Sequence, residues 1–227
     1  MENNKQLFLR ITGLLGAISS LSAAASDIAL SHAPISPLKL NLYLFLQAKP
    51  QSRLLIGHYL GILSFPLAVL ALWHIYQAIK PAGRWLSLPP VLLTGYGYIC
   101  AAVWHGAFAY FNSGLQARDA VLGEALVPLN GMIDKFKDYF IPLFWIISAI
   151  FLVAFLWFFM LIVLRRTLYP RWLALLSPAP IVIYFWLVSL LLPPAISGAL
   201  WSAGLNIAGI ILFGASTLLL WNVNKNQ

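Results

Sequence analysis

The chain has 227 residues, of which 61% are hydrophobic and 9% are charged, and its formal net charge is +8. Soluble domains average about 25% charged residues, so this composition excludes a soluble monomer. The single cysteine excludes an intrachain disulfide framework and a cysteine-rich zinc site. The basic residues separate apolar runs instead of forming a dense patch, which indicates topogenic charge at a membrane surface and no nucleic-acid partner.

Six apolar runs are long enough to cross a membrane, because a spanning helix needs about 20 residues. The runs lack the alternation of apolar and polar residues that is typical of strands in a membrane barrel. We therefore predict an all-α fold, in which residues 1–227 form a single polytopic transmembrane helical bundle of about six spans. The spans are expected at 7–30, 54–79, 88–111, 140–164, 172–192 and 195–221.

The first run has a second interpretation. Lys5 and Arg10 precede a short apolar stretch, and small residues follow from Ser22 to Ser26. This order also resembles a secretory signal peptide with a small-residue cleavage site. Cleavage would leave five spans, so the sequence leaves both alternatives open.

Lysine and arginine near the ends of the spans predict which side of the membrane each loop faces. With six spans, the two termini share one side with the loops after the second and fourth spans. The cluster of Arg165, Arg166 and Arg171 lies in the second of these loops. We therefore expect both termini in the cytoplasm.

Two longer connections, at 31–53 and 112–139, are expected on the extracytoplasmic side. In the first, prolines flank leucines that alternate with other residues, which favours a segment lying at the membrane interface. The second mixes charged and apolar residues and suits either a functional cap or a solvated connector. Proline and glycine at 81–83 and the proline pair at 193–194 predict tight turns.

Small residues recur at three- and four-residue steps along the first, third and sixth spans, a pattern that lets helices approach closely in a membrane. We expect these three helices to form the interior. The fourth span is bulky and aromatic and is expected to face lipid. The stripes comprise Gly13, Gly16, Ala17, Ser20, Ala24 and Asp27, then Tyr98, Ala101, Ala102, His105, Ala109 and Asn112, and finally Gly198, Ser202, Asn206, Gly209 and Ser216.

Three ionisable residues are expected at a similar depth near the extracytoplasmic side. Asp27 lies about one turn from the outer end of the first span, and His58 and His105 lie within the outer turns of the second and third spans. Ionisable residues inside membrane spans are costly and are functional by default. With Asn112 on the face of His105, and Glu124 in the long loop, they form the candidate ligand-binding set.

Several roles suit this set. An Asp beside a His can fix the tautomer of the imidazole and act in general-base chemistry, or the groups can hydrogen-bond a polar ligand head. Two His and one carboxylate can bind a divalent metal, but no tightly spaced pair exists, so we expect neither metal nor cofactor. All three can instead be interface anchors or satisfied interhelical contacts. His74, deeper along the second span, is interpreted as an anchor at the cytoplasmic interface.

No nucleophile elbow, zinc-protease motif, Walker A loop or dinucleotide fingerprint occurs in the chain, so catalytic residues remain unknown. The first half resembles a family of uncharacterised bacterial multi-pass inner-membrane proteins. The motifs that carry this resemblance are Gly57-His58-Tyr59-Leu60-Gly61, Trp73-His74-Ile75-Tyr76, Lys80-Pro81-Ala82-Gly83 and Trp104-His105-Gly106-Ala107-Phe108. It implies a bacterial inner membrane and about six helices, and no activity.

Three functions are open at this point. The first is binding or transport of a small or lipid-like ligand at a polar pocket near the extracytoplasmic face. The second is an intramembrane enzyme that acts on a lipid or acyl substrate through Asp27, His58 and His105. The third is an accessory or assembly subunit of a membrane complex. The expected partners are membrane lipids and the ligand, and the oligomeric state cannot be read from the sequence.

Overall fold

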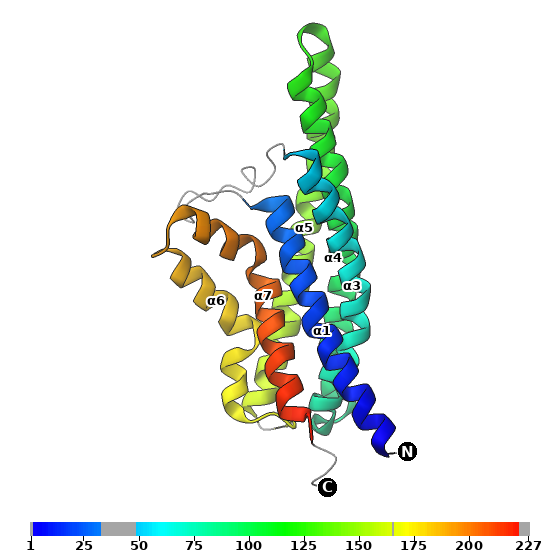
Figure 1. The fold of residues 1–227 in the computed structure, drawn as a ribbon, viewed down its shortest axis with the longest axis vertical. Helices are drawn as coiled ribbons and strands as arrows, with labels where there is room; N and C mark the ends of the chain where they lie inside the picture. The colour runs from blue at the N-terminus through cyan, green and yellow to red at the C-terminus, as the bar shows by residue number, and fades with distance from the viewer. Residues whose placement is uncertain (1, 33–48, 165, 223–227) are drawn as a thin grey trace.

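The computed structural model of the chain describes residues 2–32, 49–164 and 166–222, which form helices and no strand (Figure 1). Long apolar runs form α-helices because lipid offers the backbone no hydrogen-bonding partner, and three of these helices continue through internal prolines. Short 3-10 helices, labelled η, join or precede some of them. In chain order the elements are α1 (Glu2–Ser31), α3 (Gln51–Ile79), η2 (Lys80–Ala82), α4 (Arg84–Ala120), η3 (Gly123–Ala125), α5 (Leu126–Val163), η4 (Arg171–Leu176), α6 (Pro178–Ser189) and α7 (Pro194–Leu220).

Five of the described helices, α1, α3, α4, α5 and α7, are long and apolar enough to cross a membrane. The remaining predicted span, at 172–192, is not one continuous helix. It is divided into η4 and α6, which has 12 residues, with Ser177 and Pro178 at the break. At about 2.0 Å per residue for a 3-10 helix and 1.5 Å for an α-helix, the two pieces together rise at most about 30 Å. The roughly 30 Å of a hydrocarbon core is thus the upper limit for this discontinuous segment, which would reach it only with its two pieces in line.

The predicted loop at 112–139 is mostly helical. α4 continues to Ala120 and α5 begins at Leu126, so the connection is confined to the residues around η3. The two helices have 37 and 38 residues, well beyond the roughly 20 that a membrane requires. They form a hairpin that projects past the other helices, at the end opposite the N-terminus (Figure 1). The other predicted long connection, at 31–53, lies largely outside the described residues.

α1 lies between α3 and α7, and α4 packs against α3 on one side and α5 on the other. Small residues allow the close approach of α1 and α7, as the stripes predicted. A Cβ atom at Gly16 would collide with the ring of Phe213, and one at Gly209 would meet the hydroxyl of Ser20. The fourth predicted span, now part of α5, is exposed along only part of its surface, because Phe151 and Phe158 pack inward.

Polar side chains fasten both ends of α1. Near its start, the Gln6 and Arg10 side chains donate hydrogen bonds to the carbonyl of Trp221, so the beginning of α1 and the end of α7 lie together. At its other end, the guanidinium of Arg53 donates to the carbonyls of Ile28 and Ala29. A cation at this position stabilises the negative end of the helix dipole.

Candidate functional site

A buried polar cluster joins three helices about one turn from the end of α1. The Oδ1 atom of Asp27 lies 3.2 Å from Nε2 of His105 on α4. The Nδ2 atom of Asn206 on α7 donates a hydrogen bond of 2.6 Å to Oδ2 of Asp27. Asp27 is 8% exposed and His105 is 3% exposed. Both carboxylate oxygens therefore have a polar partner from another helix, as a buried carboxyl group requires.

Ser26, on the face of α1 that meets α3, completes the cluster. Its hydroxyl donates a 2.6 Å hydrogen bond to the carbonyl of Gly57 and lies 3.0 Å from Nδ1 of His105. The approach depends on Gly61, because a Cβ atom there would collide with the His105 ring and the Ser26 hydroxyl. The imidazole also packs edge-on against Phe65, with ring centroids 4.9 Å apart. Small residues on α3 and an aromatic ring thus hold His105 in one orientation.

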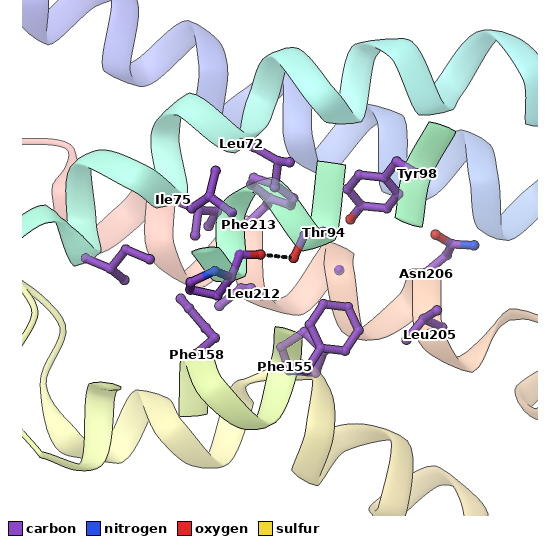
Figure 2. Close-up of a pocket in the computed structure, with 15 residues that line it drawn as sticks. Leu72, Ile75, Thr94, Tyr98, Phe155, Phe158, Leu205, Asn206, Leu212 and Phe213 are labelled. Atoms are coloured by element: carbon purple, nitrogen blue, oxygen red, sulfur yellow. Dashed lines mark hydrogen bonds between the residues drawn. The ribbon is translucent and has the colours of Figure 1, made fainter. Parts of the chain in front are cut away.

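A cavity of about 40 Å³ lies beside this cluster, between α3, α4, α5 and α7 (Figure 2). Most of its wall is aliphatic or aromatic, and Tyr98, Thr94 and Asn206 supply polar atoms. The Tyr98 hydroxyl points into the cavity, and Asn206 lies along the same wall (Figure 2). Asn206 therefore connects the cavity with Asp27. The apolar lining includes Leu72, Ile75, Phe155, Phe158, Leu212 and Phe213.

His58 does not join the cluster. Its ring packs against Tyr59 and Tyr110, with centroid distances of 5.1 Å and 6.1 Å, and its buried Nδ1 has no partner within the described part of the chain. No hydrogen bond or ion pair between described atoms connects His58 with Asp27 or His105. The structure thus brings together two of the three ionisable residues that the sequence grouped.

Asn112 holds the start of α3 against α4. Its Oδ1 accepts a 2.9 Å hydrogen bond from the backbone N–H of Lys49, and the Gln116 side chain donates to the Lys49 carbonyl. The Lys49 ammonium donates to the carbonyl of His32. Burial, with the nearby Arg53 guanidinium as the second cause, lowers the pKa of Lys49. Asn112 therefore fixes backbone here, although its buried Nδ2 has no partner among the described atoms.

Glu124 lies far from the cluster. It is exposed and belongs to η3, at the tip of the projecting hairpin (Figure 1). The fifteen residue steps along α4 from His105 to Ala120 rise about 22 Å. Glu124 was grouped with Asp27 and His105 as part of a long loop, but this segment is a helical extension that keeps Glu124 apart from them.

A second buried network, which the sequence did not predict, involves His74. Nδ1 of His74 lies 2.8 Å from the carbonyl of Leu9, and Nε2 lies 2.7 Å from the hydroxyl of Ser216, which in turn lies 2.6 Å from the hydroxyl of Tyr169. His74 is only 1% exposed, so its interpretation as an interface anchor was wrong. Burial raises the pKa of Tyr169, and the hydrogen bond to Ser216 opposes that rise.

The Asp27–His105 cluster is chemically suited to holding a proton or to hydrogen-bonding a polar group. No group of three or more His, Cys, Asp or Glu side chains within residues 2–32, 49–164 and 166–222 has a metal-binding arrangement. The signal for Asn206 was present in the sequence, since it lies on the small-residue stripe of its span. The signal for Ser216 was its place on the same stripe, but nothing in the sequence pairs it with His74.

No curated protein and no solved structure matches the chain. A family model does match it, over residues 1–225, and that family is described as a family of unknown function. This match is consistent with the uncharacterised family that the sequence motifs indicated. The chain belongs to this family of unknown function, DUF6796.

Proposed function

We propose that this membrane protein binds a small amphipathic, lipid-like molecule in the cavity between α3, α4, α5 and α7. The observation that carries the proposal is the composition of the cavity wall. One part offers aliphatic and aromatic side chains, and the other offers the Tyr98 hydroxyl and the Asn206 amide. Ligand sites in proteins are mostly apolar, with a few polar groups that fix orientation.

The helix packing supports an entrance from the lipid. α7 packs along α1 and α6, whereas α5 packs along α4. The helices on the two sides of the cavity are therefore held mainly by other neighbours, and a ligand could enter between them. Because the cavity measures only about 40 Å³, it admits a slender group such as the end of an acyl chain. The rest of such a ligand would lie between the helices or in the surrounding bilayer.

The proposed setting is a bacterial inner membrane with both termini in the cytoplasm. Support comes from basic residues at the end of the bundle where α1 begins and α7 ends. Lys80 and Arg84 flank the turn between α3 and α4 there, and Arg166 and Arg171 follow α5. Lysine and arginine near span ends favour the cytoplasmic side.

Photo-crosslinking tests the binding. The purified protein in nanodiscs is illuminated with a fatty acid that carries a diazirine on its acyl chain, and the labelled peptides are mapped by mass spectrometry. We expect labels on the cavity-lining segments of α5 and α7. Leu205→Trp should reduce that labelling about tenfold, because a filled cavity no longer buries roughly two methylene groups of the ligand.

The matched control is Leu218→Trp on the same helix, at a residue that is 78% exposed. It should leave the cavity labelling unchanged. Equal labelling of wild type and Leu205→Trp, or labels spread evenly over the exposed surfaces of the helices, would show that the cavity is not the binding site.

A second candidate function is that of an accessory subunit, and the projecting α4–α5 hairpin favours it. Leu122 is 90% exposed and Val127 is 76% exposed at the tip of the hairpin, where the chain extends beyond the rest of the bundle. Chemical cross-linking in native membranes, compared between wild type and a Leu122→Asp, Val127→Asp variant, tests this role. A partner captured only by wild type would support it.

A further inference from the structure

The hydrogen bonds around His105 determine where its protons lie. The Ser26 hydroxyl has one hydrogen, and its 2.6 Å contact with the Gly57 carbonyl needs that hydrogen, because a carbonyl oxygen only accepts. Ser26 must then accept a hydrogen bond from Nδ1 of His105 across the 3.0 Å contact. Nδ1 of His105 therefore carries a proton.

The contact between His105 and Asp27 needs a second proton. With Nδ1 protonated, a neutral ring presents a lone pair at Nε2, which would face an ionised Asp27 oxygen only 3.2 Å away. Two acceptors at this distance repel each other, so a proton must lie between them. It belongs either to an imidazolium beside a carboxylate or to a carboxylic acid beside a neutral ring. In both cases the pair as a whole is neutral.

The surroundings of the pair favour this neutral state. α3 presents the Gly57 carbonyl and the Phe65 ring, α4 presents the Trp104 ring, and α7 presents the Asn206 amide. None of these groups carries a charge that would compensate a lone carboxylate. Toward this end of α3, the Arg53 guanidinium donates to backbone carbonyls of α1 and the His58 ring packs on tyrosines, so each of these side chains contacts groups outside the pair.

We propose that Asp27 and His105 form a proton-binding site that controls access to the cavity. This proposal rests on the proposed function, because the controlled cavity is the proposed binding site. Release of the shared proton to water leaves a buried carboxylate, and His105 can then satisfy Asp27 or Ser26 but not both. Asn206 is held by the same carboxylate and lines the cavity, so the change reaches the cavity wall. Water then enters to solvate the charge, and His105 no longer ties α4 to both Ser26 and Asp27 of α1.

Nitrogen-15 NMR of the histidine rings tests the proton count without a ligand. The protein is labelled with ring-15N histidine, and His105→Gln identifies the His105 signal among the four histidines. We expect a protonated Nδ1 at neutral pH, in either the imidazolium or the neutral Nδ1–H form. A neutral ring protonated only at Nε2 would overturn the proposal.

Thiol labelling tests the control of access. Leu205→Cys in a Cys100→Ser background places a thiol in the cavity wall, and its reaction with a small methanethiosulfonate is timed from acidic to alkaline pH. The same thiol in a chain that also carries Asp27→Asn is the control, because the substituted amide cannot lose a proton and both thiols titrate alike. The labelling rate of the chain that retains Asp27, divided by the rate of the Asp27→Asn chain, should rise about tenfold from acidic to alkaline pH. The reason is that loss of the proton removes one hydrogen bond to a charged group.

A constant ratio in these rates would overturn the control of access, even where the NMR result holds. Should Asp27→Asn fail to fold, Asp27→Thr serves as the control, because its hydroxyl keeps a hydrogen-bonding group beside His105 and Asn206 and no carboxyl proton remains to be released. Failure of the fatty-acid cross-linking, with a rising rate ratio, would reject the lipid-like ligand and leave the proton-controlled cavity in place. The two proposals can therefore fail separately.

Discussion

At the scale of single residues, the molecule depends on a few buried polar groups that bridge helices distant in sequence. Asp27 contacts Asn206 and His105, and His74 contacts Ser216 and, through it, Tyr169. In lipid, such contacts contribute on average about 0.6 kcal/mol, and up to about 1.7 kcal/mol. Apolar helix surfaces have little preference for one another over lipid, because both are equally apolar. The main effect of the polar contacts is therefore to select one arrangement of the helices.

The substitution Ser216→Ala should destabilise the protein by about 1–2 kcal/mol, because it leaves the buried Nε2 of His74 and the Tyr169 hydroxyl without their shared partner. Thermal unfolding in detergent measures the effect. Ser148→Ala is the matched control, since that hydroxyl bonds only the carbonyl of Phe144 on its own helix. Similar shifts for the two variants would show that the His74 network adds nothing to stability.

At the scale of elements, close approach of the helices depends on positions without a side chain. Gly61 lies where α3 meets Ser26 and His105. On α4, a Cβ atom at Gly97 would collide with the Phe151 ring. Other glycines, such as Gly214 on α7, have open space around them. A glycine at a close helix contact therefore stabilises the fold, whereas a glycine with open space around it only weakens its own helix.

Gly61→Ala should destabilise the protein by about 1–3 kcal/mol, because the added methyl group displaces His105 and Ser26. Gly214→Ala should instead stabilise it, by about 0.5–1 kcal/mol, because alanine favours the helix more than glycine does. Unfolding of the two variants in the same detergent compares them directly. If both changes have the same sign, the packing at Gly61 is not as tight as the structure indicates.

Hydropathy correctly predicted the helical class and the five long spans, because both follow from residue composition alone. It missed the break in the remaining span, because Pro178 and Pro180 lie in an otherwise apolar run that keeps its mean hydropathy high. It also missed the helical extension beyond Asn112, since polar helices outside lipid leave no hydropathy signal. The burial of His74 could not be predicted, because its partner Ser216 is 142 positions away in sequence.

At the scale of the whole molecule, the beginning of α1 and the end of α7 lie together, and the α4–α5 hairpin projects at the opposite end (Figure 1). In the proposed topology, with both termini on one side of the membrane, η4 and α6 together form one crossing between α5 and α7. A break of this kind interrupts the α-helical hydrogen bonds at Ser177, whose backbone N–H and hydroxyl both donate to the Ala174 carbonyl instead.

An epitope tag inserted after Gly123 should lie on the opposite side of the membrane from tags at the two termini. In sealed vesicles, protease should therefore cleave the Gly123 tag where it spares the terminal tags, and the reverse in vesicles of the other orientation. Gly123 has a φ of +71° and open space around it, so an insertion there disturbs little packing. Protease digestion of inside-out and right-side-out vesicles reports the side of each tag. A Gly123 tag cleaved together with the terminal tags would contradict the crossing of α4 and α5.

The contact between α1 and α7 has a further consequence for how the protein is made. Asp27 and Asn206 are 179 positions apart, and synthesis proceeds from the N-terminus. Until the last helix is inserted, the small-residue face of α1 has lipid where α7 will lie, and Asp27 lacks one of its two partners. The interior that the structure describes is thus complete only once α7 is in place. A chain without α7 therefore leaves one oxygen of the Asp27 carboxyl group without the Asn206 amide that the complete bundle provides.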